Sequence, residues 1–198
     1  MLEKIGSIIT EFLNYERYKV FMQKKELEYI GNIGSLECYK FKPTVFKQYS
    51  TVYEKEQGPD YVNSVRHKVR MFLEWIRGGY TIYYFFENDI CCGHAVVARG
   101  GGRVEASTKE DIVIGPIWVN PCCRKKGIGT KIVFYIASMA DIKYKKAYEY
   151  ILESNIPSIR VAEKNGFSFV GRAKEKGLLK KIVLDEKGKI KLFEFVTK

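Results

Sequence analysis

The stretch from Asp111 to Thr130 constrains the fold of this 198-residue chain more than any other part of the sequence. Its first half, residues 112–119, is mostly apolar, β-branched and aromatic and is bounded by Pro121, which predicts a buried strand. Its second half is basic and rich in glycine. Apolar residues then recur at helical spacing, at positions Ile128, Ile132, Val133, Ile136, Met139 and Ala140. The order is therefore strand, short turn and amphipathic helix.

The turn before this helix has the chemistry of a phosphate site. The first backbone N–H groups of a helix have no intrahelical acceptor and carry the positive end of the helix dipole. Gly127 and Gly129 would let a phosphate reach these groups, and three basic residues precede them: Arg124, Lys125 and Lys126. A basic helix start that binds no ligand is the alternative interpretation.

Two common phosphate loops do not match this turn. A P-loop requires G-x-x-x-x-G-K-S/T, but here Gly129 is followed by Thr130 and Lys131 in the wrong order. The dinucleotide fingerprint requires three glycines as G-x-G-x-x-G, and only Gly127 and Gly129 are present. The pattern that does match is R-x-x-G-x-G, which begins at Arg124 shortly after the strand.

Charge and cysteine usage narrow the class of protein. The formal net charge is +11, from 34 basic and 23 acidic residues, which favours a polyanionic ligand or serves solubility alone. That ligand can be nucleic acid, an anionic membrane surface or a phosphorylated cofactor. Four of the five cysteines lie in adjacent pairs and no C-x-x-C occurs, so we expect no metal site and a reducing, cytoplasmic environment. No secretory signal or run of ~18 apolar residues occurs, so we expect no membrane segment.

Periodicity predicts the elements before the central stretch. Residues 2–13 present one apolar helical face, which packs on the domain's own sheet or meets a membrane or partner. Short strands are predicted at 17–21 and 36–42, a helix at 59–77, and two strands at 80–87 and 90–98 joined by the hairpin turn Asn88-Asp89. No helix follows the glycine run at 100–102, which indicates a flexible connection and not a phosphate loop.

After the central stretch, alternation predicts a strand at 145–152. Asn155 is a good N-cap for a short helix that ends at Gly166. Strands follow at 167–170, 178–184 and 190–196, and the last two form a hairpin. The sum is a mixed α/β (α+β) domain around one sheet with flanking helices, without a second domain.

The segment from Asn155 to Phe167 carries a second motif, N-x-x-S followed by E-K-x-G-F. With R-x-x-G-x-G, it resembles the acetyl-CoA motifs of the GNAT superfamily of acyl-CoA-dependent N-acyltransferases. The resemblance covers roughly Tyr80 to Val196 and looks most like the branch that contains ribosomal-protein N-terminal, amino-sugar and antibiotic acetyltransferases. It implies one acetyltransferase domain over 1–198, with an acceptor-side region at 1–79 and an acetyl-CoA-binding core at 80–198. It also implies a central twisted sheet splayed between two parallel strands.

The resemblance implies that acetyl-CoA is the co-substrate, with no metal, and it assigns three groups of binding residues. The pantetheine arm would lie along one strand end, formed by Ile117, Trp118 and Val119. The pyrophosphate would lie on the turn and helix start, at Arg124, Lys125, Lys126, Gly127, Ile128, Gly129 and Thr130. Asn155 and Ser158 would hydrogen-bond the pantetheine arm or the thiol. Gly115-Pro116 would form a bulge in the strand, beside which a free N–H would stabilise the oxyanion.

One position departs from the family pattern. Many members have a tyrosine four residues after the position of Ser158, as the acid that protonates the departing thiolate, and here that residue is Ala162. The thiolate would leave unaided or through a water, or Tyr148 or Tyr150 on the preceding strand would replace the missing acid.

The sequence offers several candidates for the general base. Glu149, Glu153, Asp111 and His94 are candidates, although each also fits a surface or core role. Strand alternation predicts that Glu149 and Glu153 share one face, opposite Tyr150. We therefore predict a catalytic group among Glu149, Tyr150 and Glu153.

The predicted function is transfer of an acetyl group from acetyl-CoA to a primary amine. The basic surplus and the aromatic residues near the N-terminus favour a small-molecule acceptor, such as a nucleotide-linked amino sugar. The alternatives are a protein N-terminal or lysine acetyltransferase, a non-catalytic CoA-binding sensor and a nucleic-acid-binding module. We do not expect nucleic acid, because no zinc, helix-turn-helix or RNA-binding signature occurs. We expect a monomer or homodimer.

Overall fold

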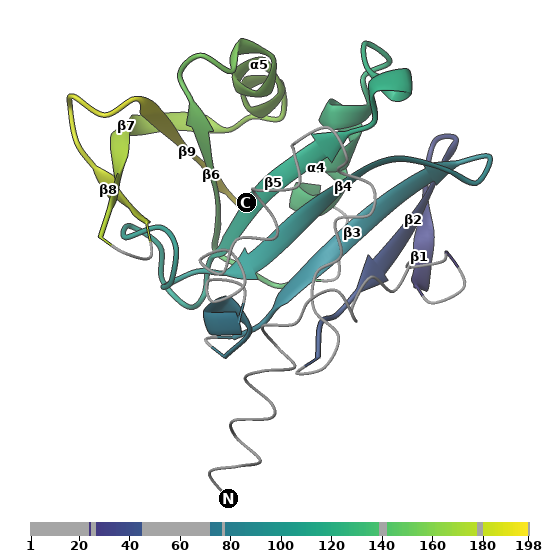
Figure 1. The fold of residues 1–198 in the computed structure, drawn as a ribbon, viewed down its shortest axis with the longest axis horizontal. Coiled ribbons are helices and arrows are strands. Elements are labelled where there is room, and N and C mark those ends of the chain that lie inside the picture. Colours follow the sequence, from purple (N-terminus) through teal and green to yellow (C-terminus); the bar gives the residue numbers. More distant parts are fainter. Residues whose placement is uncertain are drawn as a thin grey trace, which may run out of the picture.

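The computed structural model describes residues 24, 27–44, 72–76, 78–138, 142–177 and 180–197. They form a nine-stranded sheet in the order β1-β2-β3-β4-β5-β6-β9-β7-β8, with helices packed against it (Figure 1). The strands are β1 Glu28–Ile33, β2 Leu36–Phe41, β3 Tyr80–Glu87, β4 Ile90–Arg99, β5 Ile112–Val119, β6 Lys146–Leu152, β7 Ser168–Lys176, β8 Lys181–Leu184 and β9 Ile190–Val196. A 3-10 turn, η4 Pro121–Cys123, leads into α4 Ile128–Ser138, and α5 Ile156–Lys164 follows β6. This confirms the predicted mixed α/β fold.

Three apolar clusters hold the sheet in place. The first lies between one face of the sheet and both helices, and it includes Ile114, Ile136, Ile151 and Ala162. The second covers the opposite face of β2 to β5, because side chains alternate along each strand. The third lies among β5, β6, β7, β8 and β9 and includes Leu192. The sheet is therefore apolar on both faces.

The two central strands splay as predicted. β5 and β6 are parallel, but they pair only at Ile112↔Ala147 and Val113↔Tyr148. Beyond these pairs the strands diverge toward the side that carries α5 (Figure 1). The N–H and C=O groups of β5 that would pair with β6 thus have no strand partner past Val113.

The predicted bulge lies at the start of this gap. Across β4 and β5, Val97 faces Ile114 and Ala95 faces Ile117, so Gly115 and Pro116 together oppose the single residue between them. Gly115 has φ +130°, a conformation that residues with a side chain rarely adopt. The extra residue places Ile117 on the same face as Ile114, against the helices.

Several local predictions hold and others need correction. Asn88 and Asp89 have φ values of 49° and 63°, which confirms the hairpin turn. The strand predicted at 36–42 is β2, but its partner β1 was missed, and β7 extends to residue 176 instead of 170. The predicted hairpin of the last two strands is wrong, because β7 lies between β8 and β9 in the sheet. Helix is present at 72–76, within the predicted 59–77. The predictions for 2–13 and 17–21 lie outside the described residues.

The connection after β4 is not the flexible link that the sequence indicates. Val104 forms an isolated parallel bridge with Ile182 of β8, and Glu105 N–H donates to the Ile182 carbonyl at 2.9 Å. A Cβ on Gly100 would lie 2.1 Å from the Thr108 carbonyl oxygen, so the backbone packs too closely there for a side chain. Gly100 therefore permits close packing within the connection, and the Val104 bridge joins the connection to β8.

None of the helices in the described ranges is long and apolar enough to cross a membrane.

Candidate acetyl-CoA site

The turn between β5 and α4 is held to the sheet by hydrogen bonds of the Asn120 side chain. Asn120 accepts from Cys122 N–H at 3.3 Å, and its amide nitrogen donates to the Cys91 carbonyl of β4 at 3.0 Å. Lys125 and Gly127 have φ values of 63° and 75°, so both adopt the left-handed conformation just before the helix begins. The turn is therefore anchored to the sheet independently of any ligand.

The start of α4 leaves backbone donors free for an anion. The first backbone bond of the helix runs from Lys131 N–H to the Gly127 carbonyl at 3.1 Å. The N–H groups of residues 128–130 precede it and have no intrahelical acceptor. The first turn contains no acidic residue, and a Cβ at Gly127 would meet nothing within 4 Å. This open, positive helix start is where the sequence predicts the pyrophosphate.

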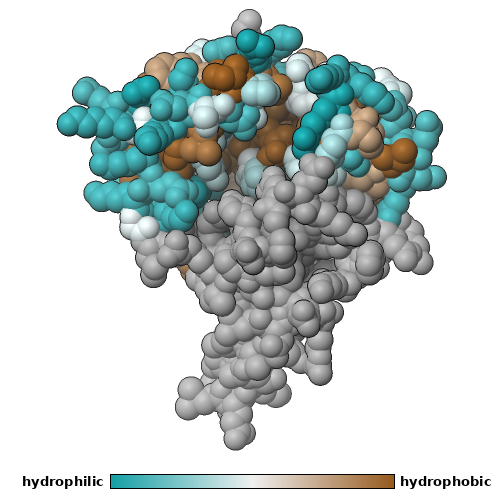
Figure 2. Space-filling view, turned by 45° about the horizontal axis from the view of Figure 1, so that its top comes forward, coloured by the Kyte–Doolittle hydropathy of each residue, from teal (hydrophilic) through white to brown (hydrophobic). Residues whose placement is uncertain are grey.

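Close packing brings three predicted binding segments together. A Cβ on Gly129 of α4 would lie 3.6 Å from Val161 of α5 and 3.7 Å from Val119 of β5. Arg124 folds back, and its Nε donates to the Val119 carbonyl at 3.1 Å. The loop, the end of β5 and α5 therefore meet at one place. In Figure 2, apolar surface on this side lies in a depression between two hydrophilic lobes.

The three residues predicted along the pantetheine arm divide between the two faces. Ile117 and Val119 pack on the cluster beneath α4 and α5. Trp118 lies on the opposite face and stacks on His94 with ring centroids 5.5 Å apart. Its buried Nε1 has no hydrogen-bond partner among the described residues. Only the backbone of Trp118 is thus available on the face that carries Ile117 and Val119.

Helix α5 begins as the second motif predicts. The Asn155 side chain accepts from Ser158 N–H at 3.3 Å and caps the helix, with Pro157 in the first turn. Ser158 is part-buried at this helix start. Ala162, at the position of the family's tyrosine, is completely buried. No hydroxyl therefore replaces the missing acid at this position of α5.

Glu149 is the most unusual of the predicted catalytic residues. It is the first residue of β6 past the last β5 pair, and it is 3% exposed. Its Oε1 has no hydrogen-bond partner among the described residues. Burial raises the pKa of this carboxyl to about 8. A buried carboxyl without a partner beside a gap between strands is a candidate for proton transfer.

Glu153 and the two tyrosines have other partners. β6 ends at Leu152, so Glu153 lies in the following turn and pairs with Arg172 at 2.8 Å; the prediction that it shares a strand face with Glu149 is therefore wrong. Tyr150 accepts from Arg103 Nε at 3.3 Å, and its ring lies under the same guanidinium. The Tyr148 hydroxyl is 3.5 Å from the Ala106 carbonyl.

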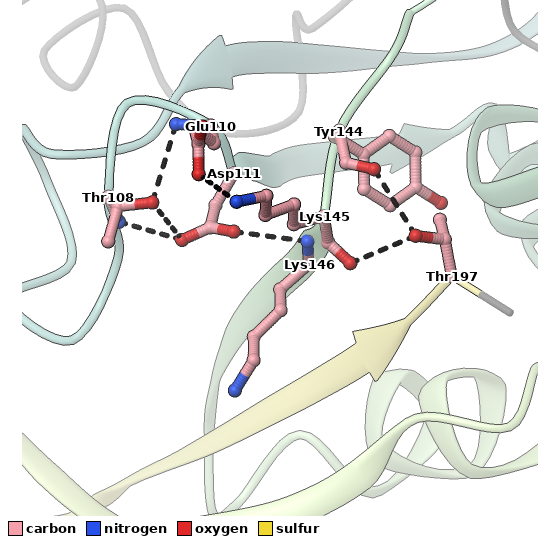
Figure 3. A network of polar contacts seen from close by, with 7 residues as sticks. All are labelled: Thr108, Glu110, Asp111, Tyr144, Lys145, Lys146 and Thr197. Atoms are coloured by element: carbon pink, nitrogen blue, oxygen red, sulfur yellow. Dashed lines mark hydrogen bonds and ion pairs between the residues drawn. The ribbon is translucent and has the colours of Figure 1, made fainter.

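Asp111 has a structural position. Its carboxylate accepts from Thr108 N–H at 2.7 Å, from the Thr108 hydroxyl at 2.8 Å and from Lys146 N–H at 3.0 Å (Figure 3). It thus joins the starts of β5 and β6, while Thr197 Oγ1 binds the carbonyl of Lys145 and ties β9 to them. His94 is buried between Tyr84 and Trp118. We therefore do not assign the base to either residue.

The chain has five free cysteines, and three of them lie beside the turn between β5 and α4. The sulfur of Cys123 is 3.0 Å from that of Cys92 and 3.5 Å from that of Cys122. Burial raises the pKa of the Cys123 thiol, so it is neutral. Within the described ranges, no group of three or more His, Cys, Asp or Glu side chains could hold a metal ion.

A cavity of about 360 Å³ lies at the paired end of β5 and β6, away from the loop. It is lined by two cations, three aromatic rings and an aliphatic residue, among others: Lys42, Arg99, Trp75, Tyr80, Tyr83 and Ile112. No described acidic residue forms an ion pair with either cation, although Arg99 donates to the Lys143 carbonyl at 2.8 Å. Sequence reasoning missed this group, because single basic residues at strand ends look like ordinary surface charges.

Comparisons with known proteins agree with this geometry. The Acetyltransferase (GNAT) family matches residues 47–167, which is more than half of the chain. The fold is similar to that of RimL, the ribosomal L7/L12 alpha-N-protein acetyltransferase, solved in complex with coenzyme A: TM-score 0.56, 16% identity, covering 85% of this chain and 98% of that one. It is also similar to a Bacillus subtilis acetyltransferase in complex with CoA: TM-score 0.52, 14% identity, covering 80% and 98%. No curated protein matches the sequence.

Proposed function

Because this chain belongs to the GNAT family of acetyltransferases, we propose that it transfers the acetyl group of acetyl-CoA to the primary amine of a small anionic molecule, such as a nucleotide-linked amino sugar. The proposed class of acceptor is inferred from the cavity beside Ile112. A volume of about 360 Å³ suits a small ligand and not a folded protein terminus with its neighbours. Its lining comes from both regions that the sequence distinguishes, 1–79 and 80–198.

Charge and shape define the class of acceptor. Lys42 and Arg99 supply two positive groups for a phosphate or carboxylate, and Arg presents a planar fork of donors that matches both anions. Trp75 and Tyr80 offer aromatic faces to a sugar or base ring. A neutral amine would leave both cations without a ligand charge. An anionic sugar bearing an amine is therefore the simplest acceptor that satisfies all four residues.

The site separates the two substrates along β5. The phosphates of acetyl-CoA would bind the N–H groups at the start of α4, beside three basic residues: Arg124, Lys125 and Lys126. Its pantetheine arm would use the backbone groups that β5 leaves unpaired past Val113. The amine would attack the thioester carbonyl near the bulge, where an unpaired N–H of β5 would stabilise the oxyanion.

The test is turnover by the full chain with four acceptors at equal concentration: nucleotide-linked amino sugars, free amino sugars, aminoglycosides and short peptides. We expect the nucleotide-linked sugars to give the highest kcat/KM. Lys42→Met and Arg99→Met should each raise KM for them by about tenfold or more, while KM for free amino sugars changes little. Lys187→Met, in the turn before β9, is the matched control. Turnover of peptides alone, unaffected by either cavity variant, would contradict the proposal.

A further inference from the structure

We propose that Glu149 is the general acid of this enzyme, and that its carboxyl group protonates the departing CoA thiolate in the place of the tyrosine that Ala162 replaces. The inference rests on the proposed acetyl transfer, but not on the identity of the acceptor. In many members of the family, the acid is a tyrosine on the helix that corresponds to α5. Here the proposal assigns this role to a residue of β6.

The position of Glu149 is the first argument. β5 and β6 stop pairing at Val113 and Tyr148, so Glu149 stands at the point where the gap opens. On its other side it lies directly opposite Phe193 of β9. Alternation along β6 places Glu149 on the face of Ala147 and Ile151, which pack in the same cluster as Ala162. The carboxyl is therefore on the face from which the family's tyrosine would act.

The state of the carboxyl is the second argument. A side chain that is 3% exposed, with an Oε1 that has no partner in the described part of the chain, is costly as a carboxylate. It holds its proton at neutral pH, because burial raises its pKa to about 8. A carboxyl that keeps its proton up to about pH 8 cannot accept a proton from an ammonium group, but it can donate its own.

The groups around this face do not compete for the role. The ionisable members of the cluster are thiols and phenols, and none is a carboxyl group: Cys38, Tyr83, Cys92, Cys123 and Tyr135. Lys191 of β9 and Arg172 of β7 lie on the same sheet face as Glu149, but nearer the strand ends. Arg172 pairs with Glu153. The charged residues of α5 are exposed, namely Arg160, Glu163 and Lys164. Burial alone accounts for the raised pKa of Glu149.

The two tyrosines that could replace the acid point elsewhere. Tyr148 and Tyr150 pack with the third cluster, on the face opposite Glu149. The Tyr150 oxygen already accepts from Arg103, and the Tyr148 hydroxyl faces the Ala106 carbonyl. The acid on the face of α5 is thus Glu149.

The proposed acetyl transfer conserves protons. The neutral amine attacks the thioester carbonyl, a C–N bond forms, and the carbonyl oxygen becomes an oxyanion. Collapse of this intermediate breaks the C–S bond, and the sulfur takes the proton of Glu149. The new amide nitrogen releases one proton to water, and the Glu149 carboxylate regains one from water. The products are the acetamide and CoA thiol.

The test is the pH profile of kcat for the wild type and Glu149→Gln, with any amine that the enzyme acetylates. A free amine is needed, so kcat rises with pH, and a protonated Glu149 is needed, so kcat falls above about pH 8. Glu149→Gln keeps the size and a hydrogen-bond donor but has no proton to give. We expect its kcat to fall by about 100-fold and its descending limb to disappear, with the Kd for desulfo-CoA within about threefold of wild type.

Other outcomes overturn the proposal. Loss of the ascending limb in Glu149→Gln would identify a base, and a lower kcat with both limbs intact would identify a structural residue. Hydrolysis of bound acetyl-CoA by water needs the same protonation of sulfur and gives the same comparison without an amine. Absence of any acetylated amine would contradict the proposed function, whereas an unchanged descending limb would contradict only the role of Glu149.

Discussion

Glu149 lies directly opposite Phe193 across the β6–β9 pair, and β5 provides no partner for Glu149 on the other side. The carboxyl is therefore enclosed by apolar groups on its own sheet face and adjoins the gap between the central strands. An ionisable group is rarely buried in this way without a partner unless its environment serves a function.

Stability should depend on pH through Glu149. The carboxyl is protonated in the folded protein up to about pH 8, whereas in the unfolded chain it ionises near its ordinary pKa of 4.5. The unfolded state binds fewer protons between these values, so the contribution to stability is complete below pH 4.5 and is lost as pH rises toward 8. We expect urea unfolding to show Glu149→Gln as more stable than wild type at pH 8.5, relative to their difference at pH 4.5. A constant difference would contradict the buried, protonated state.

Charge at the phosphate loop should control cofactor affinity. Gly127→Asp places a carboxylate beside the free N–H groups of α4, where it repels the pyrophosphate. Gly127→Asn is the matched control, because Asn and Asp tolerate the positive φ about equally. Calorimetric titration should give a Kd for acetyl-CoA at least tenfold weaker for Asp than for Asn, or about 1.4 kcal/mol. Equal affinities would place the phosphates elsewhere.

The cap of α5 should contribute to stability apart from catalysis. Asn155→Ala removes the acceptor of Ser158 N–H, and loss of such a cap lowers the free energy of unfolding by about 1 kcal/mol. Asn155→Asp retains the oxygen and should unfold at nearly the wild-type urea concentration. If the Ala variant matches wild type in stability but loses affinity for acetyl-CoA, Asn155 acts on the cofactor alone.

The ion pair between the β4–β5 loop and β7 should weaken in acid. Burial raises the pKa of Glu175, but hydrogen bonds from Lys180 and Arg103 outweigh it, and the net pKa is below its ordinary value. The stabilisation is therefore present above the unfolded pKa and is lost as pH falls through the lower folded pKa. Wild type should lose stability relative to Glu175→Gln between about pH 5 and pH 3. Parallel unfolding curves for the two proteins over this range would exclude the pair as a stabilising contact.

The sequence predicts the elements whose patterns are local. The strand, turn and helix of residues 112–138 follow from apolar periodicity, and the Asn155 cap follows from spacing. β7 was predicted too short because most of its residues are polar and exposed, with little alternation to mark it. β1 was missed for a similar reason, since it is an edge strand with no fully buried residue and half of its residues are exposed.

Long-range contacts limit how much of the candidate site can be predicted from the sequence. Arg103 meets Glu175, which is 72 residues away, and neither residue has a distinguishing neighbour in the sequence. The buried state of Glu149 depends on where β5 stops pairing, which only the register of both strands reveals. Glu153 looked equivalent to Glu149 by alternation, but the strand ends one residue earlier.

Amide hydrogen exchange with and without acetyl-CoA tests most directly whether the cofactor binds along β5 and the start of α4. We predict that millimolar acetyl-CoA slows exchange in residues 125–130 and 117–119, and that desulfo-CoA does the same, because the backbone N–H groups there bind the pyrophosphate and the pantetheine arm. Unchanged exchange in both segments, with protection elsewhere in the chain or none at all, would contradict this account of the site.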